Sequence, residues 1–242
     1  KTALLVCGFP KEIADSEISA CVSGAALACK EAGVEILGGH TVRIAEPIFG
    51  LAATGYVHPN EIWRKTGMAD GDLLMLSKPL GVGVLLSTRA QSDEEIALEQ
   101  MKVSNLAARN SLAELGSAVH AVTDVTGFGL LGHLIEMTDN GRVSTVIKNK
   151  NIPLLTGTAE LSKQWVYPDN TMRNWKMYGA DVSGISGEML LTLCDPQTNG
   201  GLLFSVHPNF KGEVCKLFEA EKLPLFEIGK FELKKEFAII VE

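Results

Sequence analysis

Glycine residues separate short apolar runs along most of this chain, and this arrangement constrains the fold more than any other feature. The 242 residues include 24 glycines, which is more than a plain helical bundle would use, because glycine lowers helix stability. Between apolar runs, glycine serves tight turns and close backbone approaches, since it has no Cβ. With 46% apolar residues to build a core, we expect a mixed α and β fold.

The spacing of apolar residues predicts an order of strands and helices along the chain. Strands are expected at 3–7, 34–37, 49–57, 73–77, 119–123, 190–194 and 202–206, with closing strands within 226–241. Helices are expected from Asp15 to Gly33 and at 92–115, 130–137 and 209–221. The polar, turn-rich stretch 58–72 lies between two such blocks, so we place a domain boundary there, giving domains at 1–66 and 67–242.

The net charge of −7 and the pI near 5.3 argue against a nucleic-acid-binding surface, because binding of duplexes needs clustered Lys and Arg. No apolar stretch reaches the roughly 20 residues that a membrane helix needs. The five cysteines are an odd number without Cys-x-x-Cys spacing, which favours reduced core thiols and a cytoplasmic location. The chain opens without Met, directly in a strand, so we expect its native N-terminus to lie upstream.

Gly38-Gly39-His40-Thr41 follows a predicted strand and is a candidate phosphate-binding segment. Glycine lets a ligand approach the backbone, and backbone N–H groups and the Thr41 hydroxyl are donors to phosphate oxygens. An ordinary Gly-Gly turn with a solvent-facing His40 would give the same pattern.

Residues 123–133, TDVTGFGLLGH, place Asp124 at the end of a predicted strand beside a glycine-rich helix entry. A carboxylate there can hold Mg²⁺, which usually takes one or two carboxylates together with substrate phosphates. Asp124 could instead be the N-cap of the following helix. His133 falls one turn into that helix, where packing or capping is the more common role.

Residues 194–201, CDPQTNGG, join two predicted strands, and their Pro, Asn and paired Gly indicate a turn with a structural role. The chain contains no Gly-Lys-Ser/Thr loop of the Walker type. If ATP binds, it therefore binds by another design.

Together, GGHT at 38–41, EPIFGLAATG at 46–55, TDVTGFGLLGH at 123–133 and CDPQTNGG at 194–201 resemble selenophosphate synthetases, in that order. The string LSKPLGVGVL at 76–85 is also similar to this family. The likeness covers essentially the whole chain, and the long string at 123–133 together with the others makes it specific.

The resemblance implies an α+β fold of two domains, each a mixed or antiparallel sheet covered by helices, as in aminoimidazole ribonucleotide synthetase. Residues 1–66 would be the C-terminal part of an ATP-binding and dimerisation domain, and 67–242 a C-terminal α+β domain. It further implies a homodimer that associates through its N-terminal sheets. Gly39, His40 and Thr41 would contact ATP, and Asp124 would bind Mg²⁺.

The reaction implied by the resemblance converts ATP, selenide and water to selenophosphate, AMP and orthophosphate. The family carries its reactive Cys or selenocysteine and a Lys upstream of the point where this chain starts. We therefore expect no catalytic residue of that kind within these residues, and we expect the chain alone to be inactive.

The sequence is also compatible with two alternatives. Another ATP-dependent member of the superfamily, such as a thiamine monophosphate kinase or a hydrogenase-maturation protein, would share the fold but act on a different substrate. A non-catalytic paralogue would keep the fold as a dimerisation module and regulate a true synthetase.

Overall fold

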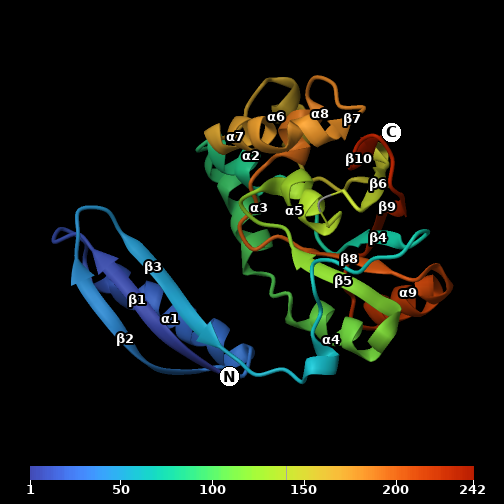
Figure 1. Cartoon of the computed structure of the whole chain (residues 1–242). Helices are drawn as coiled ribbons and strands as arrows, with labels where there is room; N and C mark the ends of the chain where they lie inside the picture. The colour runs from blue at the N-terminus through green and yellow to red at the C-terminus, as the bar shows by residue number, and fades with distance from the viewer. Residues whose placement is uncertain (140) are drawn as a thin grey trace. The chain divides into compact units, whose positions relative to one another are not determined.

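The computed structural model describes residues 1–139 and 141–242, and in it the strands pair into two separate sheets (Figure 1). The chain divides into a small unit, Lys1–Ile62, and a large unit, Trp63–Glu242. This division lies four residues before the boundary expected at 66/67, and the functions expected of the two domains stay predictions. The α+β class, with sheets covered by helices, is confirmed.

The small unit is a strand-helix-strand arrangement with one further strand. Its sheet has the order β2-β1-β3, in which β1 is parallel to β2 and antiparallel to β3. Its elements are β1 (Thr2–Phe9), α1 (Asp15–Glu31), β2 (Glu35–Arg43), β3 (Ile48–Thr54) and the 3₁₀ turn η1 (Pro59–Glu61). Successive strand residues face opposite sides, and within this unit the side chains of Ala3 and Cys7 are buried while those of Leu4 and Val6 are half exposed.

The large unit is built on a mixed sheet with the order β5-β8-β4-β9-β6-β10-β7. Pairing is antiparallel from β5 to β6 and parallel from β6 to β7. Its strands are β4 (Leu73–Leu76), β5 (Val119–Asp124), β6 (Val143–Ile147), β7 (Val182–Ser183), β8 (Leu202–Val206), β9 (Phe226–Leu233) and β10 (Ile239–Val241).

Helices and short 3₁₀ turns fill the connections of the large unit. Its helices are α2 (Val82–Ser87), α3 (Gln91–Lys102), α4 (Leu106–Glu114), α5 (Gly129–Met137), α6 (Thr158–Lys163), α7 (Asp169–Tyr178), α8 (Met189–Leu193) and α9 (Lys211–Ala220). Its 3₁₀ turns are η2 (Gly116–Ala118), η3 (Asn149–Asn151), η4 (Gly179–Asp181) and η5 (Pro208–Phe210). Among the residues that the structure describes, no helix combines the length and apolar character needed to cross a membrane.

The sheet of the large unit has an apolar core on each face, because its side chains alternate. Leu74 and Leu76 pack with α5 and α8 on one face, whereas Met75 packs with α4 and α9 on the other. In Figure 1, α5 lies above these strands and α4 and α9 lie below them. The ends of the central strands are therefore held firmly from both sides.

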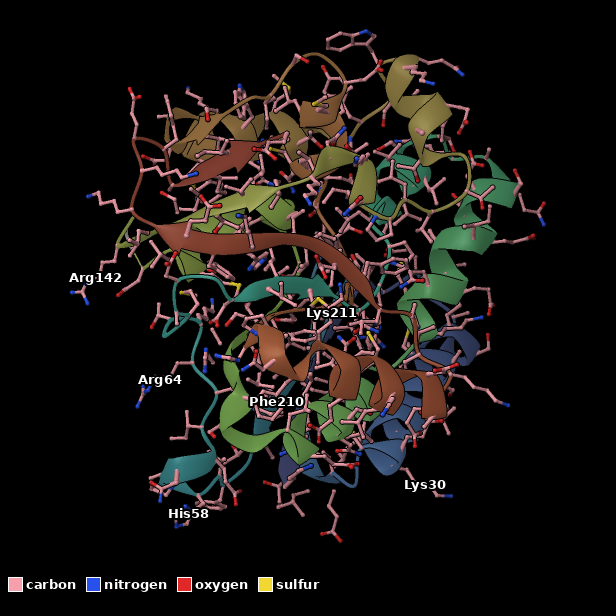
Figure 2. The ribbon with its side chains drawn as sticks, turned by 90° about the vertical axis from the view of Figure 1, so that its right-hand side faces the viewer. Lys30, His58, Arg64, Arg142, Phe210 and Lys211 are labelled. Carbon is pink, nitrogen blue, oxygen red and sulfur yellow. The ribbon has the colours of Figure 1, made fainter. Side chains whose placement is uncertain are left out.

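Charged side chains lie at the edges of the large unit. Figure 2 shows Arg64 and Arg142 extending away from the ribbon, while Lys211 lies at the start of α9 beside Phe210. The Lys211 ammonium pairs with the Glu227 carboxylate at 2.5 Å. Such exposed pairs contribute at most about 1 kcal/mol, so the two cores account for most of the stability of this unit.

Two element predictions and part of the prediction for the cysteines are wrong. The strand expected at 190–194 is the helix α8, because a short apolar run does not distinguish a strand from a buried helix. The helical stretch 92–115 is divided into α3 and α4 by a break at 103–105. Of the cysteines expected in the core, Cys7, Cys29 and Cys194 are buried, but Cys21 and Cys215 are exposed.

Candidate functional site

Asp124 is the last residue of β5, and its side chain is exposed. The next residue, Val125, is buried, and its N–H donates to the Gly201 carbonyl at 2.9 Å. The N-cap of α5 is Phe128, so Asp124 is not the cap of that helix. The carboxylate is thus exposed at a strand end that is hydrogen-bonded to the 194–201 loop.

The turn that follows Asp124 is fixed from inside by His133. The buried His133 Nε2 accepts hydrogen bonds from the Thr126 N–H at 3.0 Å and from the Thr126 hydroxyl at 3.1 Å. Its Nδ1 faces the Glu136 carboxylate at 3.4 Å, and Lys65 pairs with Glu136 at 2.8 Å. Burial lowers the pKa of His133, which keeps the ring a neutral acceptor. The expected packing or capping role is confirmed.

The CDPQTNGG string, residues 194–201, is a buried junction between two other segments. Asp195 and Gln197 are both almost fully buried. The Asp195 carboxylate accepts from the Gly83 N–H at 3.1 Å, and the Gln197 N–H donates to the Thr126 carbonyl at 3.0 Å. The three strings at 76–85, 123–133 and 194–201 therefore meet at the end of β5 that carries Asp124.

Close backbone contacts at this junction explain several of its glycines. A Cβ at Gly200 would lie 2.2 Å from the Val125 carbonyl oxygen, and one at Gly129 would lie 2.7 Å from the Cys194 carbonyl carbon. Gly129 also has φ +68°, which favours glycine. The glycines of both strings thus allow two loops to pack backbone against backbone.

Lys78 is a buried cation at the same junction. Its ammonium donates to the carbonyls of Val103 at 2.5 Å and Asn199 at 2.9 Å. Val103 is the C-cap of α3, where the helix dipole favours a positive charge. Burial nevertheless lowers the pKa of Lys78 to about 8, so this ammonium is held with little solvent to stabilise it.

Three further residues at this junction, Lys78, Asp195 and Gln197, are not predicted as functional residues from the sequence pattern. The available signal was the occurrence of charged and amide side chains inside strings otherwise made of apolar residues and glycine. Such residues are buried only when they are paired or hydrogen-bonded. Their contacts join segments more than 100 residues apart, which spacing along the chain cannot reveal.

Gly39, His40 and Thr41 belong to the small unit, and here the expected turn is wrong. All three lie inside β2, paired with β1. A Cβ at Gly39 would lie 2.0 Å from the Leu5 carbonyl oxygen, so this glycine allows a close strand approach. Because strand residues alternate, His40 faces the side of the sheet opposite to Thr41. All three residues are exposed.

Asp124 meets the requirements of a Mg²⁺ ligand, although it does so alone. Within residues 1–139 and 141–242, no three His, Cys, Asp or Glu side chains gather closely enough to hold a metal ion by themselves. Mg²⁺ commonly binds one or two carboxylates and completes its shell with water and substrate phosphates. A single exposed carboxylate at a rigid strand end fits that mode of binding.

Comparison with known proteins matches both units. Residues 1–57 match the description AIR synthase related protein, N-terminal domain, and residues 69–242 match AIR synthase related protein, C-terminal domain. Among solved structures, thiamine monophosphate kinase from Aquifex aeolicus has a TM-score of 0.65 at 17% identity, covering 100% of this chain and 73% of its own. The hydrogenase maturation protein HypE of E. coli has a TM-score of 0.70 at 18% identity, covering 99% and 69%. These likenesses establish the fold.

Sequence relatives are more specific. A selenide, water dikinase of Haemophilus influenzae (strain 86-028NP) is 35% identical over 99% of this chain and 70% of its own length. The selenide, water dikinase of Bordetella bronchiseptica is 36% identical over 99% of this chain and 71% of its own length. That of Colwellia psychrerythraea is 38% identical over 94% of this chain and 67% of its own length. With this identity over nearly the whole chain and both domain matches, the chain belongs to the selenide, water dikinase family of AIR synthase related proteins.

Proposed function

We propose that the gene product containing this chain converts ATP, selenide and water to selenophosphate, AMP and orthophosphate. One observation carries the proposal: relatives named selenide, water dikinase share 35% identity with 99% of the chain. The strings that carry the resemblance are also the ones that meet beside Asp124 in the large unit. The thiamine monophosphate kinase and HypE likenesses, at 17% and 18% identity, concern the fold alone.

Asp124 is the proposed Mg²⁺ ligand. When bound, Mg²⁺ neutralises charge on the polyphosphate and orients the γ-phosphoryl group for in-line transfer. This chain contributes the Asp124 carboxylate. The backbone that follows Asp124 is hydrogen-bonded to the 194–201 loop, so the carboxylate needs little reorganisation when a metal ion binds. Selenide is a strong nucleophile, so the main demand on the protein is to exclude water from the first transfer and admit it later.

Gly39, His40 and Thr41 are the proposed ATP contacts of the small unit. Their exposure on β2 supports the proposal. The Thr41 hydroxyl and the His40 ring face opposite sides of the strand, so they would contact different parts of a bound nucleotide. His40 shares its face with Leu4 and Val6, so a second copy on that face would place His40 at the dimer interface, and its ATP contact would then be made across that interface.

The proposed partner of the small unit is a second copy of this chain. One face of its sheet carries Leu4, Val6, Val42 and Ile48, with exposed fractions of 51%, 50%, 44% and 60%. An apolar face of this kind on a small sheet favours association. The resemblance to selenophosphate synthetases names a homodimer as the occupant.

A cytoplasmic location completes the proposal. All five cysteines are free thiols, and two of them, Cys21 and Cys215, are exposed. Exposed free thiols persist where glutathione and thioredoxin keep cysteines reduced.

Phosphorus NMR tests the proposed reaction. The complete gene product is incubated anaerobically with ATP and Mg²⁺, with and without selenide, and AMP, orthophosphate and selenophosphate are followed together. We expect selenophosphate and AMP to appear in equal amounts, and only with selenide. ATP consumption that does not depend on selenide would favour a different kinase of the superfamily, and no consumption would favour a regulatory paralogue.

A further inference from the structure

The Gln197 side chain uses its full hydrogen-bonding capacity inside the large unit. Its Oε1 accepts from the N–H groups of Gly81 at 3.2 Å and Val82 at 3.3 Å. Its Nε2 donates to the carbonyl oxygen of Asp195 at 2.9 Å and to Oδ2 of the Asp195 carboxylate at 2.8 Å. A primary amide offers two acceptor lone pairs and two donor hydrogens, so no other side chain of this size could make the same four bonds.

The Asp195 carboxylate is the second part of this arrangement. It is fully buried, and its Oδ2 accepts from both the Gly83 N–H and Gln197. Its Oδ1 has no hydrogen-bond partner among the residues that the structure describes. Burial raises the pKa of this carboxyl to about 7. Because Oδ2 accepts from both groups, the Asp195 carboxyl connects the 194–201 loop to the segment 81–83.

The main chain of the same loop holds the segment after Asp124. The Gln197 N–H donates to the Thr126 carbonyl at 3.0 Å, and the Gly201 carbonyl accepts from the Val125 N–H at 2.9 Å. Val125 and Thr126 directly follow Asp124 in the chain. Gln197 therefore contacts the 81–83 segment through its side chain and the Asp124 turn through its backbone.

We propose that Gln197 and Asp195 are positioning residues for Asp124. They lock the 194–201 loop against the segment 81–83, and the locked loop fixes the strand end that presents the metal-binding carboxylate. Neither residue touches a substrate in this scheme. The inference rests on the proposed function, because it presupposes that Asp124 binds a metal ion.

The first test compares Mn²⁺ binding, followed by EPR in the presence of ADP, in the complete gene product and its Gln197→Met variant. Methionine has nearly the same volume but makes none of the four hydrogen bonds. We expect Mn²⁺ affinity to fall at least about tenfold, as for other residues that orient metal ligands. Asp195→Asn, which keeps an acceptor for Gly83, should change the affinity less than about threefold. Gln164→Met, at the exposed end of α6, is the matched control and should behave as wild type.

Steady-state kinetics of Gln197→Met distinguish the loss of a positioning residue from a general loss of stability. We expect Gln197→Met to lower kcat and to raise the Mg²⁺ concentration needed for half-maximal rate, with the KM for selenide unchanged. A folded Gln197→Met protein with Mn²⁺ affinity within about twofold of wild type would overturn the proposal.

Amide hydrogen exchange of the wild-type protein keeps the proposal testable if Gln197→Met does not fold. Coupling between two sites is reciprocal, so Mn²⁺ with ADP should slow exchange of the amides at 81–83. Unchanged exchange would contradict the inference.

The Asp124→Ala variant distinguishes failure of the metal role of Asp124 from failure of the positioning role of Gln197. If this variant still binds Mn²⁺, the proposed metal role fails. If it loses Mn²⁺ while Gln197→Met keeps it, only the positioning role fails.

Discussion

The two units present their candidate residues in different ways. In the large unit, Asp124 lies at a strand end whose neighbours are held by buried side chains of two other loops. In the small unit, Gly39, His40 and Thr41 are exposed on an edge strand of the sheet, which pairs with β1. The large unit thus contains the means to orient its carboxylate, while the small unit leaves an apolar sheet face uncovered.

The two units also differ in the source of their rigidity. The large unit buries Asp195, Gln197 and Lys78 among apolar residues, and each is hydrogen-bonded to at least one backbone group of a distant segment. Such bonds favour one arrangement of the segments, because breaking them would leave further buried polar groups unpaired. The small unit buries few side chains, so we expect its rigidity to depend on the proposed second copy.

The largest expected effect is the pH dependence of the large unit. The pKa of Asp195 is about 7 in the folded chain, against an ordinary value of 3.8. Between these values the folded protein holds a proton that the unfolded chain has released, so stability falls as pH rises through this window. The loss is on the order of 4 kcal/mol. Urea unfolding at several pH values measures it.

Asp195→Asn should remove this slope, since an amide does not titrate. Asp181→Asn, at an exposed position of the same unit, should keep it. Equal slopes for wild type and Asp195→Asn would contradict the burial of an acid at this junction.

The next largest effect is on the free energy of unfolding, which we expect to differ between a truncation in the large unit and one in the small unit. Leu131 is fully buried in α5, whereas Val6 is half exposed on β1. Leu131→Ala should lower the free energy of unfolding by about 3 kcal/mol, and Val6→Ala should lower it by less than about 1 kcal/mol. The three tryptophans, Trp63, Trp165 and Trp175, all belong to the large unit, so tryptophan fluorescence follows that unit. A shift of the fluorescence transition by Val6→Ala as well as by Leu131→Ala would show that the two units unfold together.

A smaller effect concerns the uncovered sheet face. Ile48→Asp places a charge on that face and should raise the dissociation constant of the homodimer at least about tenfold, or about 1.4 kcal/mol. Leu233→Asp changes a residue of the large unit that is 71% exposed and should leave the dimer intact. Sedimentation velocity over a range of concentrations measures both. Dissociation by Leu233→Asp, or none by Ile48→Asp, would place the interface elsewhere.

The sequence predicted the fold class and the position of Asp124 because those depend on local pattern. An apolar run followed by a glycine-rich string predicts a strand end and a helix entry, and β5 and α5 follow that pattern. The break between α3 and α4 was not predictable. Asn199 and Lys78 donate to the carbonyls at its edge, including that of Val103, and these contacts exist only in the folded chain.

Two glycine pairs show that a Gly-Gly sequence by itself does not distinguish a turn from a close contact between distant segments. Gly38-Gly39 predicts a turn, yet Gly39 serves close pairing of β2 with β1. Gly200-Gly201 predicts a turn between strands, and it does precede β8, but its close contacts are with the backbones of Val125 and Lys78. A glycine pair in the sequence indicates a tight turn or a close backbone contact. Whether the contact is with a ligand or with another segment of the chain depends on the folded structure.

The most direct test of the account is the rate of selenide-dependent AMP formation by the complete gene product carrying Asp124→Asn, with Asp181→Asn as the matched control. Because Asp124 is exposed, the variant should fold and melt as wild type does. We predict that its rate falls at least about 100-fold, the scale for removing a group that stabilises developing charge, while Asp181→Asn keeps the wild-type rate. An Asp124→Asn enzyme within about threefold of wild type would contradict the assignment of Asp124 as the metal ligand.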